Sequence, residues 1–168
     1  MPPSHNPQPA TDLYLRPAIF EALAEAARRG YPREVCGLLV GSRSRSDGTI
    51  EIARAEPATN LEQERAADRY RLDPRDFLAI DKAARHDGFD VVGVWHTHPD
   101  HPAGPSDTDL EAAWPDYLYL IISVAGGETI RMRAWELVDG RFVERPIVTG
   151  RRLDHPAAGR NEPTSTHP

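Results

Sequence analysis

The amino-acid sequence predicts an α/β fold in which a mixed central sheet carries helices on both faces. Two patterns lead to this prediction. Helical and strand patterns alternate along residues 17–124, and two further strand patterns follow each other at 129–148. At 168 residues the chain is long enough for one domain with a sizeable core.

The first predicted elements are a helix and a buried strand. Pro17 suits the first position of a helix, the helical pattern places Ile19 and Leu23 on one face, and Gly30 stands where a capping glycine ends a helix. The continuous apolar run at 34–41 is typical of a strand buried on both faces.

A second strand, an irregular segment and a second helix follow. Alternating apolar residues predict a strand at 49–55. The charged segment 60–71 has no clear period, so we expect a mobile loop or a weak helix there. Asp73 and Pro74 form a strong helix start, because aspartate caps free N–H groups and proline fits the first turn, and Gly88 ends this helix.

The second half of the chain continues with strands and one short helix. Asp139-Gly140 predicts a hairpin with a type I′ turn. The expected elements are a strand at 91–98, a helix from 106 to about 114, a strand at 117–124, and hairpin strands at 129–138 and 142–148.

Composition narrows the classes of function. The net charge of −6 and the absence of a basic stripe argue against nucleic acid as a partner. The longest apolar run, 118–125, is too short to cross a bilayer. With no signal peptide at the first residues, we expect no membrane contact and a cytoplasmic location. The single cysteine, Cys36, excludes a disulfide within the chain and is expected to be a core residue rather than a nucleophile.

The ends of the chain differ from its middle. Both are rich in proline and polar residues, so we expect disordered tails at 1–12 and 151–168 around one domain at 13–150. Nothing in this organisation excludes a homodimer.

His96 and His98 stand two residues apart in the strand predicted at 91–98, so both side chains point to the same face. Two imidazoles side by side suit two ligands of a tetrahedral metal ion. Pro99 ends the strand, and Asp109 in the next element is the candidate third ligand. Three protein ligands with one open position are typical of a catalytic zinc site.

Ser106 and Asp109 also have a second interpretation. Their spacing is close to a capping box, in which both side chains satisfy helix N–H groups. The nearby histidines favour ligation by Asp109, and Ser106 can cap the helix and also donate a hydrogen bond to an oxyanion. Glu34 is the best candidate for a general base because it opens a buried strand, although a surface charge at a strand edge is the alternative.

Glu34, His96-x-His98-Pro99 and Pro105-Ser106-x-x-Asp109 together resemble the JAMM signature of the MPN+ zinc metalloproteases. The resemblance covers residues 13–146. It implies one zinc ion with a bound water, held by His96, His98 and Asp109. It implies Glu34 as general base and acid and Ser106 as oxyanion donor, within an α/β/α sandwich similar to cytidine deaminases.

The resemblance also implies a substrate class. Family members that act on ubiquitin cleave after a Gly-Gly tail, and the eukaryotic ones carry an insertion after the metal motif. Only seven residues separate Asp109 from Tyr117 here. The chain is therefore more similar to small bacterial members that remove C-terminal residues from ubiquitin-like sulfur-carrier proteins. We expect such a carrier, or a peptide, as the partner, bound by strand addition to a sheet edge.

Other functions stay open. A non-catalytic MPN-type scaffold would bind a partner protein, and a general small-peptide or amide hydrolase would use the same site. Residues 96–101 also read H-x-H-x-D-H, a signature of metallo-β-lactamase-fold hydrolases. That fold needs further downstream histidines, and only His155 and His167 in the predicted tail are present. Asp100 and His101 are then loop residues above the site, and their contact with substrate is left open.

Overall fold

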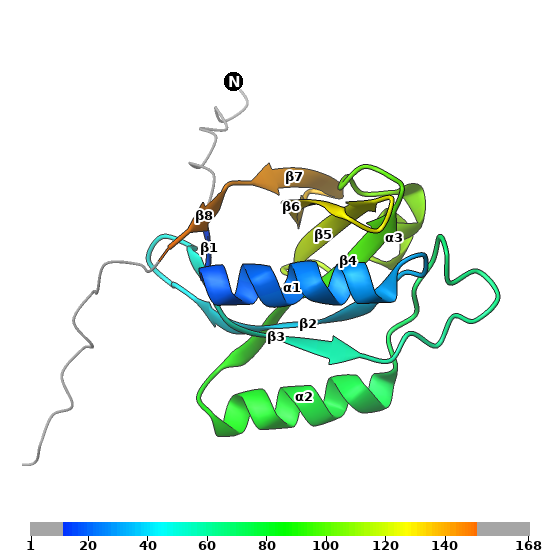
Figure 1. Ribbon diagram of the computed structural model, residues 1–168. Helices are drawn as coiled ribbons and strands as arrows, with labels where there is room; N and C mark the ends of the chain where they lie inside the picture. The colour runs from blue at the N-terminus through cyan, green and yellow to red at the C-terminus, as the bar shows by residue number, and fades with distance from the viewer. Residues whose placement is uncertain (1–11, 151–168) are drawn as a thin grey trace, which may run out of the picture.

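The computed structural model describes residues 12–150, which form eight strands in one mixed sheet and three helices (Figure 1). The helices are α1 (Pro17–Gly30), α2 (Pro74–His86) and α3 (Asp107–Ala112). The strands are β1 (Leu13–Leu15), β2 (Cys36–Arg43), β3 (Ile50–Ala58), β4 (Asp90–Pro99), β5 (Leu118–Ala125), β6 (Thr129–Val138), β7 (Arg141–Arg145) and β8 (Ile147–Thr149). The predicted α/β class is confirmed.

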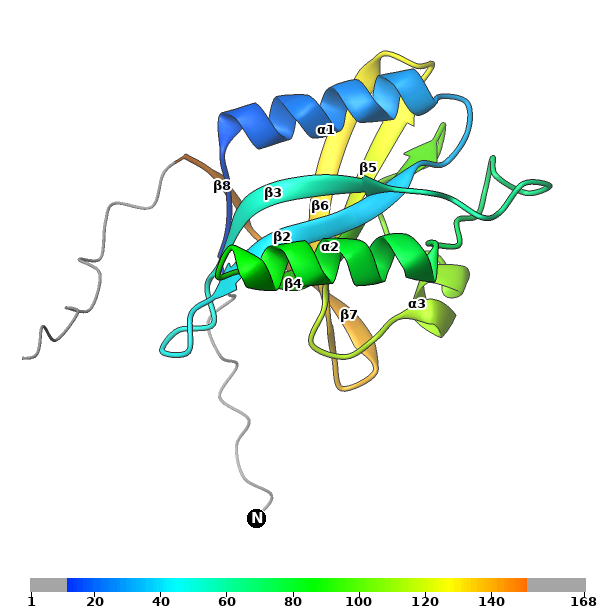
Figure 2. The same cartoon turned by 90° about the horizontal axis from the view of Figure 1, so that it is seen from below.

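The sheet has the strand order β7-β6-β5-β4-β2-β3-β1-β8. Figure 2 shows α1 and α2 on opposite sides of β2 and β3, so helices cover both faces as predicted. The main core lies on the α1 side, where Leu23 and Ala27 pack with Leu39, Ile52 and Trp95 of the sheet. Burial of these apolar side chains is the main force that holds the two layers together.

The predicted ends of the two long helices agree with the structure, but one of them has a different cause, and α3 ends at Ala112, before the predicted end near 114. The Asp73 side chain accepts a hydrogen bond from the backbone N–H of Arg75, which is the expected cap of α2. Gly30 is the last residue of α1 and does not have a left-handed conformation. A Cβ atom at Gly30 would lie 2.4 Å from Cγ1 of Val35, so close packing, and not a cap, requires glycine there.

The strand predicted at 142–148 is two strands. Asp139-Gly140 forms the expected turn, with positive φ at both residues, and β7 pairs with β6. Pro146 then ends the ladder, because proline has no N–H to donate. The next residues form β8, which pairs in parallel with β1 at the opposite edge of the sheet. A single residue thus joins strands at both edges, so the sheet must curve until its edges meet.

β1 was not predicted, because three residues are too few for a recognisable pattern. It lies between β3 and β8 and pairs in parallel with both. The carbonyl of Pro146 accepts a hydrogen bond of 2.9 Å from the Leu13 N–H. The short strand therefore supplies the backbone partners that complete the curved sheet.

Residues 59–73 form an ordered connection between β3 and α2, which we name the Tyr70 loop. The weak-helix alternative for 60–71 is wrong, since no helix forms there. The Asn60 side chain organises this loop: its amide donates to the carbonyls of Glu34 and Arg69 at 3.1 and 3.2 Å. Its oxygen accepts from the N–H groups of Glu62 and Arg71, both at 2.9 Å.

The two predicted tails, 1–12 and 151–168, lie outside the described residues apart from Asp12, whose carbonyl accepts a hydrogen bond from Ile50. Among residues 12–150, the helices are all too short or too polar to cross a membrane.

Candidate metal centre

Three buried side chains meet at the end of β4. His96 is fully buried, and His98 and Asp109 expose 8% and 6% of their surface. Nε2 of His96 lies 3.0 Å from Nε2 of His98 and 3.1 Å from Oδ1 of Asp109, and Nε2 of His98 lies 3.4 Å from Oδ2 of Asp109. The structure therefore brings together the three side chains that the sequence predicts as metal ligands.

The position of β4 explains why the two histidines are buried side by side. β4 lies in the interior of the sheet, antiparallel to β2 and parallel to β5. Thr97 lies between the histidines in sequence, and its hydroxyl oxygen accepts a 2.9 Å hydrogen bond from the Val35 N–H. The Thr97 N–H donates in turn to the Val35 carbonyl at 3.0 Å. These two bonds fix the segment that carries Glu34 against the histidine strand.

His98 is oriented by the loop that follows β4, residues 100–106, which we name the Pro102 loop. Nδ1 of His98 lies 2.9 Å from the Pro102 carbonyl. Because a carbonyl oxygen can only accept, Nδ1 must carry the proton. Nε2 of the neutral ring then presents a lone pair toward His96 and Asp109. A carbonyl partner of this kind is common for metal-bound histidines.

His96 is oriented in a different way. Within residues 12–150 its Nδ1 atom is buried without a hydrogen-bond partner. Its ring is stacked on the ring of Tyr70, with centroids 4.4 Å apart and planes inclined by 26°. Sequence reasoning missed Tyr70, because it lies in a charged segment without a motif. The only local signal is that it is the one aromatic residue of the loop.

Asp109 combines both of the roles considered from the sequence. Ser106 and Asp109 form a complete capping box at the start of α3. Oδ2 of Asp109 accepts from the backbone N–H and the hydroxyl of Ser106, both at 2.7 Å, while Oδ1 faces His96. The cap therefore holds the carboxylate in the orientation that a metal ligand needs, and the two interpretations do not compete.

The charges of the three groups suit a cation. Burial opposes ionisation of Asp109, yet hydrogen bonds with His96 and His98 hold the pKa of its carboxyl far below the usual range. Burial lowers the pKa of His96, which favours the neutral ring. Burial also acts to lower the pKa of His98, but its contacts with Asp109 and Pro102 raise that pKa overall.

The donor atoms have spacings that fit zinc. With bonds of about 2.0–2.1 Å, two donors of a tetrahedral ion lie about 3.3 Å apart. Nε2 of His96 lies 3.0 Å from Nε2 of His98 and 3.1 Å from Oδ1 of Asp109, and one ligand atom from each of the three residues lies within 4.8 Å of the others. Two imidazoles and a carboxylate are also a donor set that zinc prefers. The residues present therefore fit a metal ion, and three ligands leave a further position free.

Glu34 lies beside this centre without belonging to it. The side chain is 6% exposed and precedes β2, whose first residue, Cys36, pairs with His96 across the sheet. The pKa of Glu34 is raised to about 7, mainly by burial; the charge of His98 acts to lower it, and the charges of Asp109 and Asp68 act to raise it. A carboxyl group with a pKa near neutrality can both accept and return a proton. The sequence-based alternative of an exposed charge at a strand edge is therefore wrong.

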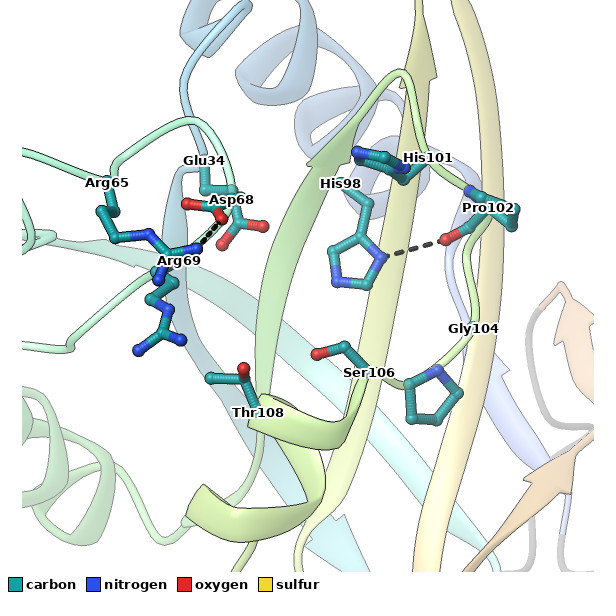
Figure 3. Close-up of a pocket in the computed structure, with 11 residues that line it drawn as sticks. Glu34, Arg65, Asp68, Arg69, His98, His101, Pro102, Gly104, Ser106 and Thr108 are labelled. Carbon is teal, nitrogen blue, oxygen red and sulfur yellow. Dashed lines mark hydrogen bonds and ion pairs between the residues drawn. The ribbon is translucent and has the colours of Figure 1, made fainter.

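A cavity of about 500 Å³ opens in front of Glu34 and His98. Figure 3 shows the Tyr70 loop on one side, with Arg65, Asp68 and Arg69, and the Pro102 loop on the other. Ser106 and Thr108 lie at the α3 end of the cavity. His98 and the carboxyl of Glu34 are thus accessible through one opening.

Asp100 and His101 lie outside the three-residue group. The Asp100 carboxylate accepts from the Gly126 N–H at 2.8 Å and the Tyr31 hydroxyl at 2.9 Å, which fastens the Pro102 loop to the β5–β6 turn. His101 is exposed and lines the cavity. The H-x-H-x-D-H interpretation is not supported by this arrangement, and His155 and His167 lie outside the described residues.

Cys36 is a core residue. It is 1% exposed, and burial raises the pKa of its thiol to about 12, so it is not a thiolate nucleophile at neutral pH.

A mixed α/β domain with two histidines, an aspartate and a nearby unligated glutamate defines the class of metal-dependent hydrolases. Comparison with known proteins identifies the family. Residues 16–138 match the prokaryotic homologs of the JAB domain. The chain belongs to this family, and the resemblance to JAMM enzymes is confirmed.

Individual relatives agree with this assignment. The desampylase of Haloferax volcanii is 40% identical over 134 residues, which cover 79% of this chain and 89% of that protein. The CysO-cysteine peptidase of Mycobacterium tuberculosis is 32% identical over 136 residues, with coverage of 80% and 89%. A solution structure of a Desulfitobacterium hafniense protein matches with a TM-score of 0.74 and 32% identity, over 85% of this chain and 96% of that one. Both named relatives are enzymes, which disfavours the non-catalytic scaffold.

Proposed function

We propose that this chain is a zinc-dependent peptidase that hydrolyses a peptide or isopeptide bond after a Gly-Gly tail and removes C-terminal residues from a ubiquitin-like sulfur-carrier protein in the cytoplasm. One observation carries the proposal: a buried glutamate with a pKa of about 7 lines an open cavity together with His98, one of the three candidate metal ligands. This arrangement combines a metal site with a separate proton-transfer group.

His96, His98 and Asp109 would hold one zinc ion. When bound, zinc supplies Lewis-acid chemistry, in that it activates a water molecule and polarises the scissile carbonyl. The protein keeps the ligands ready for it: Pro102 fixes the tautomer of His98, Tyr70 fixes the plane of His96, and Ser106 fixes the carboxylate of Asp109.

Glu34 is the proposed base and acid. It takes a proton from the attacking water and returns it to the leaving amine, so one carboxyl group serves both proton transfers. A pKa of about 7 in the metal-free site keeps it close to the pH at which both transfers are feasible.

Ser106 is the proposed oxyanion donor, and the structure adds a condition to this role. Its hydroxyl lines the cavity but donates its proton to Oδ2 of Asp109 at 2.7 Å. To donate to a developing oxyanion, the hydroxyl has to turn away from Asp109. The backbone N–H of Ser106 would still hold the carboxylate at 2.7 Å.

The proposed substrate class rests on the similar proteins and on the short segment that follows the metal site. The chain resembles a desampylase and a peptidase named for CysO-cysteine, and α3 and a five-residue connection, 113–117, separate the metal site from β5. All proposed site residues lie within the proposed domain 13–150.

The test is the intact mass of a sulfur-carrier protein that bears one extra residue after its Gly-Gly end. Zinc-loaded enzyme should remove that residue, and the chelator-treated enzyme and the Glu34→Gln variant should not. A carrier whose mass is unchanged after incubation with zinc-loaded wild type would refute the proposed substrate.

A further inference from the structure

The two arginines of the cavity are in different electrostatic situations. Arg65 forms an ion pair with Asp68 in the same loop, so its charge is already balanced. Arg69 also lines the cavity, and among residues 12–150 its guanidinium has no hydrogen bond or ion pair. The Tyr70 loop therefore presents one unbalanced cation to the cavity.

This cation lies on the same side as the proposed base. Figure 3 shows Glu34, Asp68, Arg65 and Arg69 together, opposite His101 and Pro102. Glu34 and Asp68 both line the cavity, and Figure 3 shows them beside each other, so this part of the loop lies near the Glu34 carboxyl. Because Glu34 returns its proton to the leaving amine, the leaving residue must lie on this side of the cavity.

We propose that Arg69 binds the free α-carboxylate of the leaving residue and thereby selects substrates that end one residue after the cleaved bond. This inference rests on the proposed peptidase function. It names the chemistry of the leaving group: an α-amino acid with a free carboxylate, in preference to an amidated end, a longer peptide or the side-chain amine of a lysine.

Geometry and chemistry support this assignment. In a single leaving residue the carboxylate carbon is two bonds from the scissile nitrogen, so the two groups must be bound close together. Arginine matches a carboxylate with two parallel N–H donors, which gives orientation as well as affinity. Glu34 lines the cavity, and its carboxylate would repel a free carboxylate unless a cation compensated for it.

The experiment compares three peptides that share a Gly-Gly-X sequence: one with a free terminal carboxylate, one with a terminal amide, and one with Gly-Gly joined to the Nε atom of a blocked lysine. We expect kcat/KM for the free acid to exceed that for the amide and the isopeptide by about 10- to 100-fold, the range for a hydrogen-bonded charge.

Three variants locate the effect. Arg69→Gln should reduce the acid-to-amide ratio of kcat/KM to about 1, and Arg69→Lys should give an intermediate ratio, because lysine keeps the charge but loses the paired donors. Arg71→Gln is the matched control: Arg71 is exposed in the same loop but does not line the cavity, so its removal should leave the ratio as in wild type.

The outcomes separate this inference from the proposed function. Equal cleavage of acid and amide by wild type, or an unchanged ratio in Arg69→Gln, would refute the role of Arg69 and leave the peptidase intact. Failure of zinc-loaded wild type to cleave any of the peptides or the carrier would refute both. Peptide affinity can also be measured without turnover in the Glu34→Gln variant. This variant should bind the free-acid peptide more tightly than the amide, and an added Arg69→Gln change should remove the difference.

Discussion

The two loops that flank the cavity hold the metal centre in different ways. The Pro102 loop acts over a short sequence distance: the Pro102 carbonyl binds His98, and Ser106 binds Asp109 three residues later. The Tyr70 loop acts over a long one, since Tyr70 stacks on His96 and Asn60 binds the carbonyl of Glu34. Each loop fixes a different histidine, one by a hydrogen bond and one by a ring contact.

The two loops differ in how far their contacts with the site can be predicted from the sequence. Short-range contacts produce a recurring spacing of residue types, which a reader can recognise. Long-range contacts produce no such spacing: in the sequence of the Tyr70 loop, Tyr70 and Asn60 are single residues among charged ones. The Pro102 loop is further anchored to the sheet, because the Trp135 indole donates to the Ala103 carbonyl at 3.0 Å, whereas Asn60 forms the corresponding anchor of the Tyr70 loop.

The largest expected effect comes from removing Asp109, whose carboxylate is held by Ser106 of the Pro102 loop. Asp109→Ala removes a proposed ligand and should abolish stoichiometric zinc binding, a larger loss than the roughly 10- to 100-fold cost of removing an outer partner of a ligand. His101→Ala, five residues after the start of the motif His96-x-His98, should keep its zinc. Elemental analysis after dialysis measures both, and zinc loss in His101→Ala would contradict the ligand assignment.

Glu34, between the two loops, should control stability in the chelator-treated protein. Folding raises its pKa to about 7, so the folded state binds this proton more tightly than the unfolded chain, and stability falls as the pH rises from about 4 to 7. Glu34→Gln cannot lose a proton. It should equal wild type near pH 4 and exceed it by about 3 kcal/mol near pH 8.

Denaturant unfolding of the metal-free proteins at both pH values measures this difference. A constant difference between the two proteins across the range would show that Glu34 does not titrate there.

Asn60→Ala tests the anchor of the Tyr70 loop. It removes four hydrogen bonds, two of them donated by the side-chain amide and two accepted by its oxygen. We expect a loss of about 2 kcal/mol in the free energy of unfolding, since each partly buried bond contributes up to about 1 kcal/mol. Gln63→Ala in the same loop is the control, because the exposed Gln63 side chain makes no hydrogen bond within residues 12–150. An equal effect of both variants would argue against the anchor.

The smallest expected effect concerns the ring contact alone. Tyr70→Ala removes the stack on His96 and should weaken zinc binding by about 2- to 10-fold, the equivalent of the 0.5–1.5 kcal/mol that such contacts contribute. Tyr70→Phe keeps the ring and should bind zinc as wild type does. Competition with a chromogenic chelator measures both affinities. Equal weakening in Tyr70→Phe would mean that the hydroxyl, and not the ring, supports His96.

The sequence predicted the α/β class, both long helices and most strands, because those elements have periodic apolar residues and strong caps. It did not predict β1 or the break at Pro146. β1 has three residues and is ordered by its neighbours β3 and β8, so its structure depends on contacts far along the chain. The curvature that joins the two sheet edges has the same origin and no local pattern.

The site, too, was predicted only where its residues form a local motif or open a buried strand. His96, His98, Asp109, Ser106 and Glu34 were all predicted. The structure groups His96, His98 and Asp109, and it places Glu34, His98 and Ser106 at one cavity. Tyr70 and Arg69 were not predicted, since only the fold brings residues 59–73 beside β4 and Glu34. The sequence also left the capping and ligand roles of Asp109 as alternatives, whereas the geometry shows that one carboxylate can serve both.

In the proposed mechanism Glu34 transfers the proton, whereas other residues hold the metal. The Glu34→Gln variant separates these two roles. Zinc content and kcat on a Gly-Gly-X substrate should be measured on the same preparation. We predict one zinc per chain, as in wild type, with kcat lower by about 10²- to 10⁴-fold, the usual contribution of a general acid–base group. Retained activity at full zinc occupancy would contradict the role of Glu34 as general base and acid.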